Sequence, residues 1–556
     1  MRRSFLLTFL LLAACASGPR GLPGAEDLEA GAAAAQPGDA SYHLLMGEIA
    51  MQRDENAAAA SEYLKAARAS SDPEVAARAT RVTWAFGTQS ESLQAAQRWA
   101  ALAPEDPEPR GYLVRIHLRE PDVDRALEHL EFLYDETAER PFLDLLPLTG
   151  DAGDRKAALE AMERLAAAHE EDASGAYAVS FLALRAGDAD KAVTSARAAV
   201  DKEPEWTEAA MMYARALAAA GKADEALDWL EARPDGQSPE MRLERAVLLM
   251  AAERNEEARE LLQALLEEEP DNPAALRALG YLAYFTGDLD AAGRHFTSLL
   301  STGRYGNDAL FYLGSIAEVR GNLEEAARLY SRVSGGENLV TAQVRLALVM
   351  YRMGRPELAV NHLEEFAEMQ PEAALQLGGA RAELLVRMDQ TDRALGVYDE
   401  LLERHPESDD TRYARALLYE RLDRIDEAVA DLRRIAERSP DDPTALNALG
   451  YTLADRTDQL EEARGLIARA LELAPDNPAI VDSMGWVLHK LGDEEEALKH
   501  LRQAWSLQRD PEVAAHLGEV LWSLGRKDEA RRLWNEAIVE FPDSDVLLEA
   551  MGRLDP

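Results

Sequence analysis

Helical periodicity dominates the chain from Ser41 to Pro542. Apolar residues recur three and four positions apart in successive stretches, which is the pattern of amphipathic helices. Pro, Gly, Asp and Asn separate these stretches, as expected at helix ends. The pattern therefore predicts an all-α chain of short antiparallel helices joined by tight turns.

One unit is written three times between Pro443 and Pro542. Each copy has a glycine in its first helix, an alanine early in its second helix, and a leucine, isoleucine or tryptophan four residues later. These residues are Gly450, Ala463 and Ile467, then Gly485, Ala497 and Leu501, then Gly518, Ala530 and Trp534. The period is about 34 residues, and the small residues let the two helices of a pair approach closely.

The second copy shows where its helices begin and end. Pro478 suits a first helical turn, and Asp476 and Asn477 precede it as N-cap candidates. Gly492 can take the left-handed conformation that ends a helix. The acidic run 493–496 then places negative charge at the N-terminus of the next helix.

This unit resembles the tetratricopeptide repeat (TPR) family. The resemblance implies a right-handed superhelical solenoid in which each helix pair is stabilised by stacking on its neighbours. Traced backward, the unit predicts about fifteen helix pairs over residues 40–542 without an internal linker, followed by a capping helix and tail in 543–556. Glycines mark the turns inside the pairs, at Gly187, Gly221, Gly287, Gly321, Gly354 and Gly525.

Residues 71–172 fit the unit least well. Prolines crowd this segment and the small residues are missing, so we expect degenerate TPR or TPR-like hairpins. Two interpretations stay open: drift in repeats that only pack, or a distinct docking surface.

The first residues have the pattern of a secretory signal. Arg2 and Arg3 precede a short apolar run, which is too short to span a bilayer as a mature helix. The segment 12–15, Leu-Ala-Ala-Cys, resembles the lipobox of bacterial lipoproteins, which implies a signal peptide in 1–14 and lipidation of Cys15. The alternative is an ordinary signal peptide with a chance cysteine. Cys15 is the single cysteine, so disulfides are excluded.

Residues 15–39 are rich in Ala, Gly and Pro and have no apolar period, which predicts a flexible tether. No aspartate follows Cys15. In lipoproteins of this kind that absence favours the outer membrane, so the expected location is its periplasmic face, reached through the lipid anchor.

The formal net charge of −42 narrows the choice of partner. It argues against nucleic acid and against a basic patch for anionic lipid. It favours basic partners, or reflects solubility or the composition of the source organism.

No catalytic or metal-binding pattern was found. The ten histidines form no helical zinc-peptidase pair, and neither a Gly-x-Ser-x-Gly elbow nor a phosphate loop occurs. We therefore predict a non-enzymatic protein without cofactor or metal.

Side chains of the first helix of each pair are the candidate partner-binding residues, because TPR proteins bind extended peptides or helices along that wall. Projecting the repeat register gives a set rich in aromatic rings, which are favoured at binding hot spots. The set comprises Tyr281, Tyr284, Phe285, Phe311, Tyr351, Tyr413, Asn447, Tyr451, Trp486 and Trp522. The alternative is that these rings pack between adjacent helices. The lysine clamp of chaperone-binding TPRs is absent, since residues 224–489 contain no lysine.

Segments 447–455 and 482–486 are similar to one group of large proteobacterial TPR lipoproteins, which includes the adaptor of the periplasmic carboxyl-terminal processing protease. The resemblance implies a scaffold that binds this protease and presents substrates such as peptidoglycan hydrolases. The alternative is a structural TPR lipoprotein of envelope biogenesis or exopolysaccharide export.

Overall fold

Capping residues in the turns start and end the helices. Asn477 precedes α28 (Pro478–Leu491), and its side chain accepts a hydrogen bond from the backbone N–H of Ala479 at 3.1 Å. Gly492 ends this helix with φ 85°, a left-handed conformation that glycine adopts without a Cβ clash. α29 (Glu494–Leu507) then opens on three glutamates. The boundaries predicted for this repeat are confirmed.

The computed structural model describes residues 39–53, 55–135, 138–149 and 154–554. The chain is 80% helical, and the described residues contain no strand, which confirms the all-α TPR prediction. The predicted signal peptide, Cys15 and almost all of the tether lie outside the described residues. Within them, no helix has both the length and the apolar character needed to cross a membrane.

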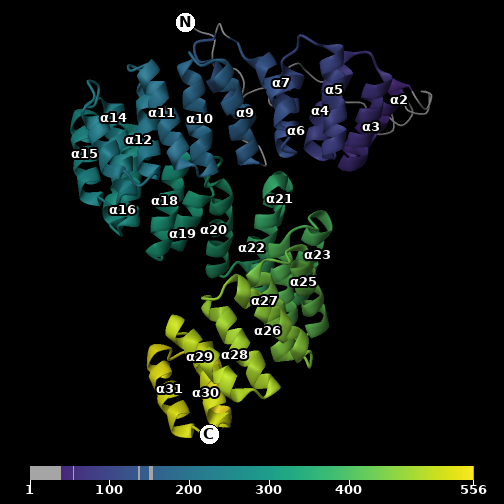
Figure 1. Cartoon of the computed structure of the whole chain (residues 1–556), viewed down its shortest axis with the longest axis vertical. Helices are drawn as coiled ribbons and strands as arrows, with labels where there is room; N and C mark the ends of the chain where they lie inside the picture. The colour runs from purple at the N-terminus through teal and green to yellow at the C-terminus, as the bar shows by residue number, and fades with distance from the viewer. Residues whose placement is uncertain (1–38, 54, 136–137, 150–153, 555–556) are drawn as a thin grey trace. The chain divides into compact units, whose positions relative to one another are not determined.

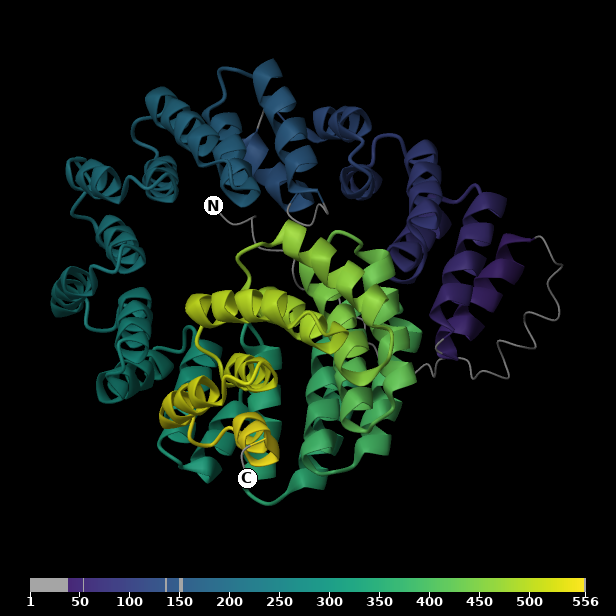
Figure 2. The ribbon, with the colours of Figure 1, turned by 60° about the horizontal axis from the view of Figure 1, so that its bottom comes forward.

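The helices group into two compact units, one ending at Thr286 and one beginning at Gly287. In the first unit, the helices form a series of antiparallel pairs that follow one another along the chain (Figures 1 and 2, purple to teal). They are α2 (Ala40–Gln52), α3 (Asn56–Ala69), α4 (Pro73–Phe86), α5 (Gln89–Leu102), α6 (Glu108–Arg119), α7 (Val123–Leu133), α8 (Pro141–Thr149), α9 (Arg155–Ala168), α10 (Ala173–Ala186), α11 (Ala189–Lys202), α12 (Thr207–Ala219), α13 (Ala223–Glu231), α14 (Pro239–Ala251), α15 (Asn255–Glu268) and α16 (Pro273–Phe285).

The second unit repeats the same arrangement of antiparallel helix pairs. Its helices are α17 (Leu289–Ser301), α18 (Gly306–Val319), α19 (Leu323–Tyr330), α20 (Leu339–Arg352), α21 (Pro356–Met369), the 3₁₀ turn η1 (Pro371–Ala373), α22 (Ala374–Arg387), α23 (Thr391–Arg404), α24 (Asp409–Arg421), α25 (Ile425–Arg438), α26 (Pro443–Arg456), α27 (Leu460–Leu473), α28, α29, α30 (Pro511–Ser523), α31 (Lys527–Glu540) and α32 (Asp545–Leu554). α32 packs on α30 and α31, at the position predicted for the capping helix.

Close contact between the two helices of a pair explains the regular spacing of small residues in the C-terminal repeats. A Cβ on Gly485 would lie 2.5 Å from Cγ of Leu501, and one on Gly518 would lie 1.9 Å from Nε1 of Trp534. Trp534 is fully enclosed, and its indole N–H donates to the carbonyl of Ala514 at 3.1 Å. A larger residue at either glycine must push the helices apart.

Stacking between pairs supplies the rest of the core. Leu453 of α26 and Ile480 and Val487 of α28 belong to one buried apolar cluster. Each helix pair thus covers an apolar face that its neighbour leaves open, which is how repeat proteins gain stability.

The least regular hairpin contains α8, inside the segment expected to be degenerate. α8 has nine residues with Pro147 inside it, and it packs on α6 and α10. Proline removes a backbone donor and disfavours a continuous helix. The degeneracy of 71–172 and the continuity of the solenoid across residue 286 stay predictions.

Candidate functional site

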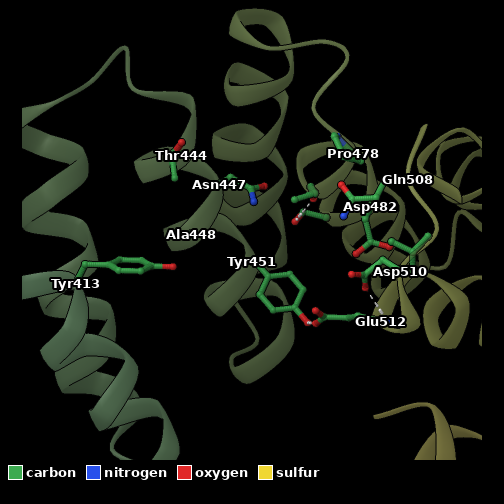
Figure 3. Close-up of a pocket in the computed structure, with 13 residues that line it drawn as sticks. Tyr413, Thr444, Asn447, Ala448, Tyr451, Pro478, Asp482, Gln508, Asp510 and Glu512 are labelled. Carbon is green, nitrogen blue, oxygen red and sulfur yellow. Dashed lines mark hydrogen bonds between the residues drawn. The ribbon is translucent and has the colours of Figure 1, made fainter. Parts of the chain in front are cut away.

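A pocket of about 350 Å³ opens on the first helices of consecutive pairs in the second unit (Figure 3). This volume is in the range of small ligand sites. α24, α26, α28 and α30 supply the walls, together with Gln508 and Asp510 from the turn before α30. The pocket is lined by Tyr413, Thr444, Asn447, Ala448, Tyr451, Pro478, Ala479, Asp482, Ser483, Gln508, Asp510, Glu512 and Val513.

Repeat register brings three of these side chains together. Tyr413, Asn447 and Asp482 each lie three residues before the small residue of their helix, so they occupy the same position in three successive units. In Figure 3, Tyr413 lies on one side of the pocket and Asp482, Asp510 and Glu512 on the other. The pocket therefore has an aromatic side and an acidic side.

The cap of α30 forms part of the acidic side. Asp510 Oδ1 accepts the backbone N–H of Glu512 at 2.8 Å, and Pro511 occupies the first helical position. The side chain of Glu512 is in turn an acceptor for the hydroxyl of Tyr451, at 2.6 Å. Burial, and then the Glu512 carboxylate, raise the pKa of Tyr451, because both disfavour its phenolate. Tyr451 therefore remains a neutral donor at physiological pH.

A buried ion pair anchors Asp482. Its Oδ2 lies 2.9 Å from Nδ1 of His516, and the two residues are 5% and 6% exposed. Burial alone would lower the pKa of His516, but the hydrogen bond and charge of Asp482, with the charges of Glu512 and Glu519, together outweigh it and the pKa is raised. The other oxygen, Oδ1, is buried and has no hydrogen-bond partner among the described residues. A buried acceptor without a partner costs free energy.

Trp486 packs against the Asp482–His516 pair on its buried side. Its ring stacks on His516 with the centroids 4.1 Å apart, and its indole N–H donates to Oδ1 of Asp455 at 3.1 Å. Trp486 is 6% exposed, a burial that the packing alternative for the aromatic set expects. It orients His516, which in turn fixes Asp482.

The remaining candidates do not line this pocket. In the second unit, Trp522 stacks on Trp534, Phe311 packs against Tyr330, and Tyr351 donates to the carbonyl of Arg387. The first unit contributes a separate group on α16. There the hydroxyl of Tyr281 accepts from Arg277, and Tyr284 meets Phe285 edge to face; Phe285 is 72% exposed. Of the ten candidates, the structure brings Tyr413, Asn447 and Tyr451 together in the pocket. A partner-binding role for the ten stays a prediction.

The acidic side of the pocket was absent from the candidate set. Asp482 could have been found from sequence, because it shares the register of Asn447. Asp510 and Glu512 could not, since their Asp-Pro-Glu motif is also an ordinary helix cap. Within the part of the chain that the structure describes, no group of histidine, cysteine and carboxylate side chains is arranged to hold a metal ion.

Comparison with known proteins defines the class. The tetratricopeptide repeat family matches residues 182–239, 243–307, 283–335, 380–443, 413–478 and 483–545, and a second tetratricopeptide repeat family matches 341–373. These segments cover more than half of the chain. The protein belongs to the tetratricopeptide repeat family, whose fold is typically that of a non-catalytic protein-interaction scaffold.

A curated relative spans almost the whole chain. It is the TPR repeat-containing protein PA4667 of Pseudomonas aeruginosa, 33% identical over 535 residues, which are 93% of this chain and 90% of that protein. Two solved structures are also similar at 16% identity. The Cut9–Hcn1 hetero-tetramer of the APC/C covers 93% of this chain and 96% of its own, with a TM-score of 0.33. The match to yeast Tom70 covers 77% of this chain and 95% of the Tom70 chain, with a TM-score of 0.38.

Proposed function

We propose that this protein is a non-enzymatic periplasmic scaffold, held at the outer membrane through lipidated Cys15, that binds protein partners through its TPR hairpins. The observation that carries the proposal is the pocket on α24, α26, α28 and α30, where side chains of four successive repeats converge. A site assembled from several repeats suits an extended segment of a partner, which can contact one repeat after another.

The partner we propose is a periplasmic carboxyl-terminal processing protease, with cell-wall hydrolases as the substrates presented to it. The support is the similarity of segments 447–455 and 482–486 to TPR lipoproteins of that adaptor type. Both segments contribute side chains to the pocket, through Asn447, Tyr451 and Asp482.

Affinity capture tests the partner. The tagged, full-length chain is expressed in its own host, the envelope is solubilised in detergent, and co-purifying proteins are identified by mass spectrometry. We expect the processing protease and a cell-wall hydrolase, with recovery reduced for Tyr413→Ala. Phe86→Ala is the matched control, because Phe86 in the first unit is similarly exposed, at 43% against 39% for Tyr413.

Recovery of polysaccharide-export components in place of the protease would favour the structural alternative.

Membrane anchoring has its own test. The variant Cys15→Ser is expected in the soluble periplasmic fraction or as uncleaved precursor, whereas the wild type carries a lipid label. Unlabelled wild-type protein in the soluble fraction contradicts the anchor.

A further inference from the structure

We infer that the pocket on α24–α30 takes the guanidinium of an arginine in an extended segment of the partner. The inference rests on the proposed scaffold function and names the chemistry that its site recognises. It depends on the charge of the pocket, on one buried oxygen without a partner, and on how this chain pairs its own carboxylates elsewhere.

The first argument is charge. Asp482, Asp510 and Glu512 line the pocket, and among the described residues that line it there is no lysine or arginine. His516 pairs with Asp482 from the buried side and offsets one of the three negative charges. The cavity therefore keeps a net negative charge that attracts a cation.

The second argument is the orphaned acceptor. Oδ1 of Asp482 has no hydrogen-bond partner among the described residues, and the residue is only 5% exposed, so bulk water does not satisfy this oxygen. Oδ1 of Asn447, which lines the same pocket, is also buried without a partner. Two acceptors in one pocket call for a ligand with several donors, and a guanidinium has five N–H groups in a planar fork.

The third argument is how the chain satisfies other acidic side chains that lie beside tyrosines. Arg415 donates to both oxygens of the buried Asp431, at 2.8 and 2.7 Å, and its guanidinium lies 5.7 Å from the ring centre of Tyr419. In the first unit, Arg215 donates to both oxygens of the buried Glu244 at 2.6 Å. At both places an arginine donates to both oxygens of a buried carboxylate.

The aromatic side of the pocket favours arginine over lysine. Tyr413 is 39% exposed on the side of the pocket opposite the acidic side chains, and Tyr451 lies between it and Glu512 in Figure 3. A guanidinium can stack on a tyrosine ring and still donate in its own plane to carboxylates, which a tetrahedral ammonium cannot do.

Titration calorimetry on the full-length chain tests the inference. The probe is a capped peptide Ser-Gly-Arg-Gly-Ser, compared with versions that carry citrulline or lysine in place of arginine. We expect binding of the arginine peptide in the micromolar to millimolar range, weaker binding of the lysine peptide, and loss of at least about tenfold for neutral citrulline. Equal affinity for citrulline and arginine, or equal affinity for lysine and arginine, overturns the inference, as does the absence of arginine binding.

The matched variants remove charge without removing structure. Asp510→Asn with Glu512→Gln keeps a good N-cap and an acceptor for Tyr451, so the fold should persist. We expect about a tenfold loss of arginine-peptide affinity. The control is Asp72→Asn with Glu74→Gln, because Asp72, Pro73 and Glu74 form the same cap at the start of α4, outside the pocket. Equal loss in both double variants, or in neither, contradicts the inference.

The outcomes separate this inference from the proposed function. If partner proteins are captured equally by the wild type and by the Asp510→Asn, Glu512→Gln variant, and the arginine peptide does not bind, the scaffold function stands and the arginine site is wrong. If the arginine peptide binds as expected but no protease or hydrolase is captured, the site stands and the proposed partner is wrong.

Discussion

Two tyrosine–glutamate pairs make the same hydrogen bond in different surroundings. In the first unit, the hydroxyl of Tyr63 donates to Oε1 of Glu48 at 2.6 Å; in the second, the hydroxyl of Tyr451 donates to Oε1 of Glu512, also at 2.6 Å. Burial and then the adjacent carboxylate raise the pKa of Tyr63, to about 12, as they raise that of Tyr451. The pairs share their local chemistry.

The two pairs differ in whether an arginine lies beside them. Arg78 of α4 pairs with Glu48, donates from Nε to the Tyr63 hydroxyl at 3.1 Å, and lies 5.3 Å from the centre of that ring. No arginine or lysine is among the described residues that line the pocket around Tyr451. The same hydrogen bond is therefore accompanied by an arginine of the chain itself at α2–α4, and by no lysine or arginine among the pocket-lining residues of α26 and α30.

The largest expected effect comes from removing Trp486, which packs behind the pocket on α24–α30. We call this pocket the open site, and the Tyr63–Glu48 pair with Arg78 the closed site. Trp486→Ala leaves a cavity beside His516 and should lower the free energy of unfolding by about 3–5 kcal/mol. Tyr413→Ala, at an exposed ring, should cost far less. Urea unfolding followed by circular dichroism measures both, and equal costs would contradict the assignment of Trp486 to packing.

Breaking the buried pair of Asp482 and His516 should lower the free energy of unfolding by less than Trp486→Ala does. Asp482→Asn should destabilise the protein by about 1–3 kcal/mol near pH 6. Because the pKa of His516 is raised in the folded protein, the stability from the pair is fully present below the unfolded-state pKa and is lost as pH rises through the folded-state pKa. The gap between wild type and variant, measured by thermal unfolding, should therefore narrow at alkaline pH. A gap that widens there would show that the pair does not hold a charged histidine.

Supplying an internal arginine should make the open site resemble the closed one. Gln508 is exposed and lines the pocket, so Gln508→Arg can reach the acidic side without disturbing a helix. We expect arginine-peptide affinity to fall about tenfold, or roughly 1.4 kcal/mol, with little change in melting temperature. The neutral control Gln508→Met should bind as the wild type does. Equal loss of affinity in both variants would show that the longer side chain blocks access to the pocket and that its charge does not compete with the peptide.

Removing Arg78, which pairs with Glu48 and Tyr63, should have the smallest expected effect of the four changes. Arg78→Ala should cost about 0.5–1 kcal/mol, since Arg78 is half-exposed and such ion pairs contribute little. Calorimetry should then show a second site for the arginine peptide. Arg81→Ala, which breaks the exposed pair with Glu108, should leave the stoichiometry unchanged. An unchanged stoichiometry in both variants would show that the tyrosine–glutamate pair alone does not define the site.

The sequence by itself determined the repeat and its helices. The glycine and alanine positions, the caps and the left-handed turns depend on contacts within one repeat, so the local pattern contains them. Gly485 and Leu501 meet as the spacing predicts, and Asn477 and Gly492 bound their helix as predicted.

Only the tertiary structure decided which side chains form the pocket. Asp72 and Asp510 begin helices through the same Asp-Pro-Glu cap, and Asp510 lines a pocket together with a tyrosine and a buried aspartate from other repeats. Tyr451 and Glu512 meet across 61 residues, and Trp486, one of the groove-facing candidates, is buried and stacks on His516. Such contacts depend on how one repeat rotates against the next, and stacking of whole helix faces fixes that rotation, which no single repeat encodes.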